Sequence, residues 1–235
     1  MTNERLLKPS VSVIVPALNE EQTIPATLQA IRKASQPNIE LIVVDDGSRD
    51  QTYNLSSLFA DRVIRNHVNM GKGKALMIGS QQANADIIVF IDADLGETAV
   101  YWERLLLPIL NDELDMTIAA FSAPEKKGGF GLVKGLAYHG IYRLSGYKTG
   151  SPLSGQRAMR KQVLAQIGSL AHGFGIEVGL TIDAAKAGFR IGEVQVEFRH
   201  RETGRDLKGF YHRGKQFIAV GRTLWTKWKD GRIST

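Results

Sequence analysis

The chain has 235 residues, of which 43% are hydrophobic and 23% charged, as is typical of a globular protein. It contains no cysteine, which excludes a disulfide framework and thiolate chemistry. No stretch reaches the ~18 apolar residues of a membrane-spanning helix, and residues 1–10 lack the apolar core of a signal peptide. We therefore expect a cytoplasmic protein, and the net charge of +6 favours anionic partners such as sugar nucleotides, a membrane face or nucleic acid.

The first half of the chain alternates between predicted strands and predicted helices. Strands are expected at residues 11–16, 39–45, 62–65 and 86–92, and helices at residues 19–34, 50–60 and 73–83. Strands that alternate with helices through short loops favour a mostly parallel sheet with right-handed crossovers. The carboxyl ends of such strands meet at one edge of the sheet, where open α/β folds bind their ligands.

The fourth predicted strand ends in an acidic tripeptide, Asp92-Ala-Asp94. The two carboxylates would repel each other unless a positive charge lay between them. A hard divalent cation such as Mg²⁺ or Mn²⁺ suits this position, and its open positions can carry a diphosphate. The alternative is an acidic turn in which Asp94 caps the next helix.

Three more polar loops follow predicted elements at the same edge. Pro16-Ala-Leu-Asn-Glu20 leaves the first strand, and Asp45-Asp-Gly-Ser48 leaves the second. Asp46 can accept a hydrogen bond from a base or a ribose, while Gly47 permits a tight turn. Asn69-Met-Gly-Lys-Gly-Lys74 places backbone amides and lysines at a helix start, which suits a phosphate or an anionic base edge. Each loop alone can be a turn or a solvated connector, but four such loops at one edge favour a ligand site.

These loops resemble those of family 2 glycosyltransferases with the GT-A fold. The resemblance rests on Val-Ile-Val-Pro-Ala-Leu-Asn-Glu, Val-Val-Asp-Asp-Gly-Ser, Asn-Met-Gly-Lys-Gly-Lys-Ala-Leu and Phe-Ile-Asp-Ala-Asp, and it covers residues 11–120. It implies an α/β fold with a Rossmann-like sheet flanked by helices, and a nucleotide-sugar donor, with UDP-glucose as the leading candidate. It also implies that the donor is bound by Pro16, Ala17, Asn19, Glu20, Asp46, Gly71, Lys72 and Asp92. By the same resemblance, Asp94 is the direct metal ligand and Asp92 lies near the ribose or the metal.

The second half of the chain is predicted to supply the acceptor site. A strand is expected at residues 115–120, a helix at 132–144, and a short segment at 154–160 before another helix. The glycine-rich basic stretch 122–131 is either an acceptor lid or a plain connector.

Glu177 opens a further predicted helix. It either complements the charge of the helix start or faces the acceptor hydroxyl, where it is our candidate catalytic base. The metal ligand Asp94 is the other candidate catalytic residue. A strand follows at residues 190–199. Arg205, in Thr203-Gly-Arg-Asp206, either offers a bidentate fork to the diphosphate or lies in a plain turn.

Two segments of the second half resemble glucosyl-phosphoglycerate synthases and their relatives. They are Gly-Phe-Gly-Ile-Glu-Val-Gly-Leu-Thr-Ile-Asp at residues 173–183 and Arg-His-Arg at residues 199–201, where the last strand ends. The resemblance implies that His200 is a third metal ligand beside Asp92 and Asp94, and an imidazole suits Mg²⁺ or Mn²⁺ there. The alternative is an ordinary surface or core histidine. That subgroup retains the anomeric configuration, whereas family 2 members generally invert it, so the sequence leaves the stereochemistry and the acceptor open.

The tail is predicted to be a basic amphipathic helix. Apolar side chains recur at helical spacing at Leu207, Phe210, Tyr211, Ile218, Trp225 and Trp228. Cations surround them at Lys208, Arg213, Lys215, Arg222, Lys227 and Lys229. Through residues 207–229 such a helix can lie on an anionic membrane at the inner face, but we favour packing of its apolar face on its own domain.

We therefore predict one GT-A domain over residues 1–235, with a nucleotide-sugar half at 11–120, an acceptor and metal-closing half at 121–206 and a tail at 207–235. The expected reaction is metal-dependent transfer of a hexose to a small phosphorylated acceptor, and a polyprenyl-phosphate glycosyltransferase is the alternative. A sugar-nucleotide nucleotidyltransferase is disfavoured, because that class needs a Gly-x-Gly-Thr-Arg-type loop after the first strand and this chain has Pro-Ala-Leu-Asn-Glu there. A nucleic-acid-binding module lacks a recognised motif here, and the intact aspartates disfavour a catalytically dead donor-binding protein. The sequence leaves open whether the protein forms a homodimer.

Overall fold

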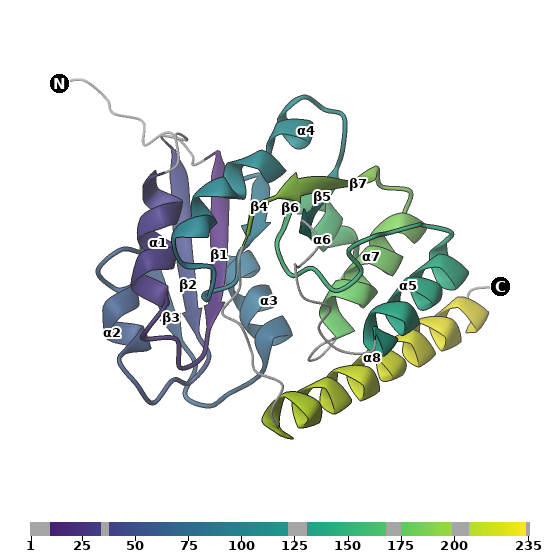
Figure 1. The fold of residues 1–235 in the computed structure, drawn as a ribbon. Helices are drawn as coiled ribbons and strands as arrows, with labels where there is room; N and C mark the ends of the chain where they lie inside the picture. The colour runs from purple at the N-terminus through teal and green to yellow at the C-terminus, as the bar shows by residue number, and fades with distance from the viewer. Residues whose placement is uncertain (1–9, 34–37, 122–130, 168–174, 199–206, 234–235) are drawn as a thin grey trace.

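The computed structural model describes residues 10–33, 38–121, 131–167, 175–198 and 207–233, with side chains of the last segment described at 214–230. These residues form a seven-stranded sheet in the order β3-β2-β1-β4-β6-β5-β7, with helices on both faces (Figure 1). The predicted α/β fold is confirmed. The strands are β1 (Val11–Ala17), β2 (Ile39–Asp45), β3 (Arg62–Arg65), β4 (Ile87–Phe90), β5 (Met116–Phe121), β6 (Arg157–Arg160) and β7 (Ile191–Val196).

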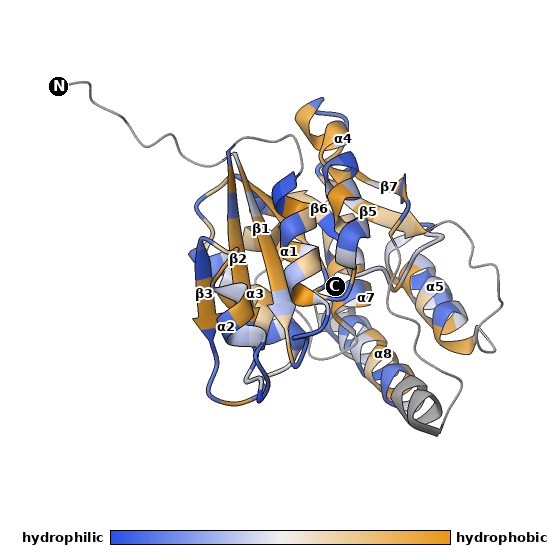
Figure 2. Ribbon diagram, turned by 60° about the vertical axis from the view of Figure 1, so that its left-hand side comes forward, coloured by the Kyte–Doolittle hydropathy of each residue, from blue (hydrophilic) through white to orange (hydrophobic). Residues whose placement is uncertain are grey.

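The central strands are apolar on both faces because helices cover both sides of the sheet. In β1, Val13 and Val15 belong to one core cluster and Ile14 to the other. Side chains alternate across a strand, so a strand covered on both faces reads as a continuous apolar run. Figure 2 shows this as orange along β1 and β2, with blue in the loops beyond their ends.

The sheet is mostly parallel, as predicted, but one antiparallel strand interrupts it. β1 pairs in parallel with β2 and β4, β2 with β3, and β5 with β7. β6 is antiparallel to both of its neighbours, β4 and β5. The sequence predicts only a short segment at residues 154–160, where the structure has β6. The four residues Arg-Ala-Met-Arg are too short and too charged at their ends to show a strand period.

The helices form two layers on the sheet and a third group beside it. They are α1 (Ile24–Lys33), α2 (Thr52–Ser56), α3 (Lys72–Gln82), the 3₁₀ helix η1 (Gly96–Leu105), α4 (Leu107–Leu110), α5 (Leu132–Ser145), α6 (Lys161–Ile167), α7 (Ile176–Lys186) and α8 (Leu207–Ile233). Leu28 of α1 and Trp102 of η1 pack on one face of the sheet. Leu76 of α3 and Leu180 of α7 pack on the other face. A third cluster joins α5, α7 and α8.

Two helices of the first half are shorter than predicted. Asn19 has φ 55°, and its amide donates to Ser48 Oγ at 2.9 Å, so the chain turns here and α1 begins only at Ile24. The predicted helix at 50–60 contains α2 over Thr52–Ser56 only. The amides of Leu58 and Phe59 bond three residues back, which tightens the chain into a turn after α2.

The predicted tail helix is present as α8, but it packs through a different face from the one expected. Val220 is fully buried against α5 and α7, whereas Ile218, Trp225 and Trp228 are 56%, 58% and 43% exposed. The close packing of α8 on α5 requires a glycine at position 140, because a Cβ there would lie 2.3 Å from Leu224 Cδ2. Among the described residues, no helix is both long enough and apolar enough to cross a membrane.

Candidate active site

A cleft of about 670 Å³ opens at the predicted edge of the sheet. Loops that follow β1, β2 and β4 line it, together with the start of α3, the segment before β6 and the first turn of α7. The predicted site residues on its wall are Pro16, Ala17, Glu20, Asp46, Gly71, Lys72, Asp92, Asp94 and Glu177. Segments more than a hundred residues apart in sequence therefore meet in one cavity.

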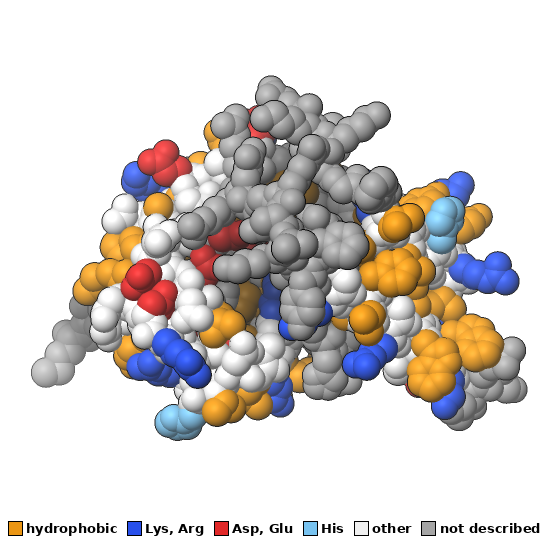
Figure 3. Space-filling view, turned by 60° about the horizontal axis from the view of Figure 1, so that its bottom comes forward, with side chains coloured by type: hydrophobic (Ala, Val, Ile, Leu, Met, Phe, Trp, Pro, Cys, Tyr) orange, Lys and Arg blue, Asp and Glu red, His pale blue; other side chains and the backbone are white. Residues whose placement is uncertain are grey.

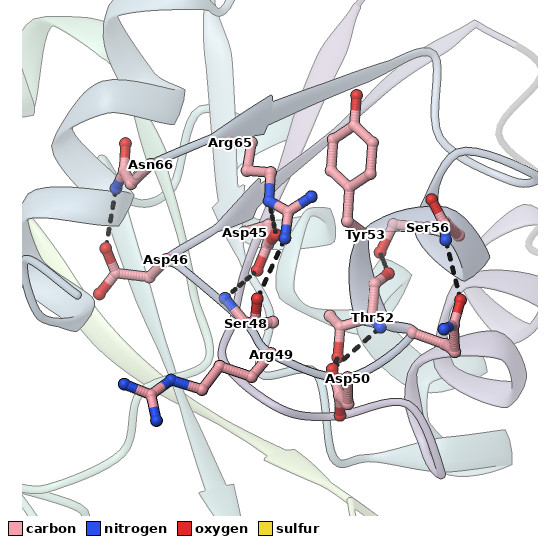
Figure 4. Close-up of polar contacts among 12 residues, drawn as sticks. Asp45, Asp46, Ser48, Arg49, Asp50, Thr52, Tyr53, Ser56, Arg65 and Asn66 are labelled. Carbon is pink, nitrogen blue, oxygen red and sulfur yellow. Dashed lines mark hydrogen bonds and ion pairs between the residues drawn. The ribbon is translucent and has the colours of Figure 1, made fainter. Parts of the chain in front are cut away.

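Asp46 holds the glycine-lysine loop against the end of β2. Its Oδ1 accepts hydrogen bonds from Asn66 Nδ2 at 2.8 Å and from the amide of Met70 at 3.0 Å. Its Oδ2 accepts from the amide of Gly71 at 2.7 Å. Figure 4 shows the Asp46 side chain pointing to Asn66, away from its neighbour Asp45. Because Asp46 is 3% exposed and accepts three hydrogen bonds, its first role is to set the position of the loop before α3.

Asp45 and Asn19 fix the other two loops at this edge. Asp45 is fully buried; its Oδ1 accepts from the amide of Ser48 at 2.9 Å and its Oδ2 lies 3.2 Å from Arg65 Nε (Figure 4). Asn19 Oδ1 accepts from the amide of Arg49 at 2.9 Å, outside the wall of the cleft. The loops after β1 and β2 are thus tied to each other, and Asn19 acts as their junction.

Lys72 lies between two acidic side chains on the wall of the cleft. Its Nζ is 2.8 Å from Asp92 Oδ1 and 3.3 Å from Glu177 Oε1. Burial alone would lower the pKa of Lys72, but the charges of Asp92 and Glu177 outweigh it and hold that pKa above its ordinary value. The lysine is therefore a permanent cation that joins the end of β4 to the start of α7.

Asp92 and Asp94 line the same cleft, with the buried Ala93 between them. The sequence predicts a positive charge between the two acids, and the ammonium of Lys72 lies beside the first of them, Asp92. Both oxygens of Asp92 are engaged, because Oδ2 accepts from Gln156 Nε2 at 2.7 Å. Within the described residues no group of three His, Asp or Glu side chains is arranged to hold a metal ion. The predicted ligand His200 and the predicted donor contact Arg205 lie outside the described residues.

Gln156 and Gly155 are site residues that the sequence analysis did not identify. Gly155 packs so closely on the network that a Cβ there would lie 2.5 Å from Lys72 Nζ. The antiparallel pairing of β6 with β4 brings both residues to the end of β4. The signal in the sequence was a polar Ser-Gly-Gln-Arg run directly before a buried Ala-Met pair.

Arg157 is a buried residue that links two segments of the cleft wall. It is 1% exposed; its Nε donates to the carbonyl of Ser154 at 2.9 Å and its Nη1 to Thr181 Oγ1 at 2.8 Å. Burial lowers its pKa to about 10. The guanidinium thus fastens the segment before β6 to α7, the helix that carries Glu177.

The sequence matches the model of one protein family, glycosyl transferase family 2, over residues 12–168, more than half of the chain. The chain belongs to glycosyl transferase family 2. The predicted membership and enzyme class are confirmed, and the strand-edge cleft just described lies mostly within the matched residues.

Two relatives show how far this glycosyltransferase resembles known proteins. It is 31% identical over 205 residues to an uncharacterized protein of Methanocaldococcus jannaschii, and the match covers 83% of this chain and 84% of that protein. It is 32% identical over 197 residues to the glucosyl-3-phosphoglycerate synthase of Mycobacterium tuberculosis. That match covers 74% of this chain but only 60% of the synthase.

A solved structure of the Mycobacterium tuberculosis synthase has the same fold as the glycosyltransferase. The crystal structure with Mn²⁺, UDP-glucose and phosphoglyceric acid superposes with a TM-score of 0.78 at 28% sequence identity. The superposition covers 94% of this chain and 80% of that one. The similarity therefore extends beyond the family match into the second half of the chain.

Proposed function

We propose that this glycosyltransferase moves glucose from UDP-glucose to a small phosphorylated acceptor and requires Mg²⁺ or Mn²⁺. The observation that carries the proposal is the network of Lys72 with Asp92 and Glu177, beside Asp94, in the strand-edge cleft. The substrates and the metal are carried over from the similar synthase, whose crystals hold Mn²⁺, UDP-glucose and phosphoglyceric acid.

We assign the nucleotide to the part of the cleft lined by Pro16, Ala17, Glu20 and Asp46. Each carboxylate oxygen can accept about two hydrogen bonds. Asp46 Oδ2 accepts one from the amide of Gly71, so it has capacity for a base N–H as well. Asn19 contributes indirectly by fixing the loop, and Arg205 remains a proposed contact of the diphosphate.

We assign Asp94 as the direct metal ligand. Both oxygens of Asp92 already accept from Lys72 and Gln156, so Asp92 is better placed to orient the lysine than to coordinate alone. Carboxylate oxygens suit a hard cation, and His200 remains the proposed third ligand. A bound cation supplies Lewis-acid neutralisation of the departing diphosphate.

We assign Lys72 to the phosphates of the donor and Glu177 to the acceptor side. The ammonium can turn from its carboxylates towards an anionic phosphate, which is the charge that it complements. Glu177 is 8% exposed and lines the cleft at the first turn of α7. It is the candidate base if the enzyme inverts; a retaining reaction on the leaving-group face would need no protein nucleophile.

The test is release of UDP from UDP-glucose in the presence of phosphoglycerate or glycerol 3-phosphate, with Mg²⁺ or Mn²⁺ and then with a chelator. Replacing Asp94→Asn should lower kcat at least ~100-fold, because it removes a charged group that stabilises the leaving group. Asp230→Asn, at the exposed far end of α8, is the matched control and should retain full activity. Turnover that survives both the chelator and Asp94→Asn would refute the assignment.

A lipid phosphate is the second candidate acceptor. The observation that favours it is the exposed aromatic side of α8, which carries Trp225 and Trp228. Parallel assays with a polyprenyl phosphate in detergent and with the small phosphates decide between the two acceptor classes. Transfer to the polyprenyl phosphate alone would replace the small-acceptor proposal while keeping the donor and metal assignments.

A further inference from the structure

α8 exposes large apolar side chains along the side that faces away from the body of the protein. We call this the outer face of α8 and define it by Phe217, Ile218, Trp225 and Trp228, which are 43–58% exposed. At 3.6 residues per turn these positions share one side of the helix. The opposite side carries the buried Val220 and Thr223. Single exposed apolar residues are common on protein surfaces, but four large ones on one side of a helix form a patch of the kind that marks an interaction site.

A row of cations borders the outer face. Lys215, Arg222 and Lys229 are all exposed and recur every seven residues, so they lie one above another along the helix. Lys229 Nζ is 4.5 Å from the centroid of the Trp225 ring, which places charge directly beside the aromatic surface. In Figure 3 orange side chains interspersed with blue ones gather over the end of the molecule that α5 and α8 form.

We propose that the outer face of α8 docks the protein on the surface of a bilayer that contains anionic phospholipids. Tryptophans and a bordering row of Lys and Arg are the side chains that settle at headgroup depth. Cations of this kind bind more tightly as the lipid surface becomes more negative. The net charge of +6 on the whole chain acts in the same direction.

The row of cations also argues against a second copy as the occupant. When two identical helices pack antiparallel, the same border of each helix meets the same border of the other. Lys215, Arg222 and Lys229 would then face the same cations of the second copy, and like charges that face each other repel. An anionic lipid surface places opposite charge against the same row.

Docking through the outer face leaves the cleft open. Gln216 of α8 lines the cleft, but it lies on the side of the helix that carries Val220. The helix therefore stands between the proposed lipid surface and the cavity. The docking proposal does not depend on the donor or the acceptor, and it can fail or succeed separately from the proposed function.

The experiment is flotation of the whole protein with vesicles of phosphatidylcholine, with and without phosphatidylglycerol. We expect binding only to the vesicles that contain phosphatidylglycerol. Trp225→Ala with Trp228→Ala should abolish it, while Leu58→Ala with Leu107→Ala, two residues that are 72% and 59% exposed on other elements, should leave it unchanged. Replacing Lys215, Arg222 and Lys229 by glutamine should weaken binding about a hundredfold. Hydrolysis of the nucleotide sugar in solution should stay normal in all of these variants.

Tryptophan emission gives an independent reading. Trp102 is fully buried, so a blue shift on addition of vesicles would report Trp225 and Trp228 alone. Failure to float with anionic vesicles would overturn the proposal. Vesicle binding that is unchanged in the Trp225→Ala, Trp228→Ala variant would also overturn the proposal, since such binding would reflect net charge only. A concentration-dependent dimer that Trp228→Ala dissolves would assign the outer face to a second copy instead.

Discussion

At the residue scale, Lys72 is the point where distant parts of the chain meet. Its ammonium contacts Asp92 at the end of β4 and Glu177 at the start of α7, and Gly155 packs over it. Without the cation, two carboxylates would be left in a partly buried pocket with less compensation. The same residue thus serves the fold and, under the proposed mechanism, the phosphates of the donor.

Lys72→Met tests this double role. We expect UDP release to fall at least ~100-fold, because a cation that faces developing charge is lost. We also expect a lower Tm, because Asp92 and Glu177 lose their common partner. Lys33→Met, at the exposed end of α1, is the control and should change neither quantity. Full activity of Lys72→Met in a folded protein would remove the lysine from the site.

At the element scale, Asp115 fastens the edge strand β7 to β5. Its Oδ2 accepts from the amide and Nε of Arg190 at 2.9 and 3.1 Å, and its Oδ1 from Nη2 at 2.9 Å. The hydrogen bonds from Arg190 hold the pKa of Asp115 below its ordinary value. A lowered pKa in the folded state means that this stabilisation is complete above the ordinary pKa of ~3.9. It is lost as the pH falls through the folded-state pKa.

Asp115→Asn should therefore lower the free energy of unfolding by roughly 1–3 kcal/mol at neutral pH. The difference from the parent protein should shrink as the pH falls below ~4, because the parent then loses the same charge. Urea unfolding at neutral pH and below pH ~4 measures this difference in the free energy of unfolding. Glu113→Gln, at an exposed neighbouring position, is the control. A gap that stays constant with pH would show that the charge of Asp115 does not contribute.

α3 approaches the sheet closely at Gly79, where a Cβ would lie 2.5 Å from Ile14 Cγ2 and 3.2 Å from Val44 Cγ2. Gly79→Ala should cost about 1–3 kcal/mol of stability, because the helix must move away from the sheet. Gly135→Ala is the matched control, since a methyl group added at this position on α5 would meet no atom within 4 Å. That change should raise stability by up to ~1 kcal/mol through helix propensity. Equal effects in urea unfolding would contradict the close approach.

At the scale of the whole molecule, the parts that sequence reasoning predicts are those with local signals. The apolar runs of β1, β2 and β4 and the loops at their carboxyl ends follow from patterns within a few residues. β6 and Gln156 do not, because four residues with charged ends carry no period and the contact with Asp92 spans 64 residues. Which side of α8 faces outward also depends on a distant partner, since Leu224 packs where α5 has the small residue Gly140. His200 and Arg205 stay predictions.

The strand β6 means that the first half of this protein is not a separable piece. Residues 87–90 are paired on one flank by β1 and on the other only by a strand that arrives about 70 residues later. A nascent chain that has not yet reached residue 157 presents Ile-Ile-Val-Phe as a bare apolar edge, which invites intermolecular pairing. Such a chain also lacks the Gln156 amide that binds Asp92, so the acidic end of β4 would be complete only once about two thirds of the 235-residue polypeptide had been made.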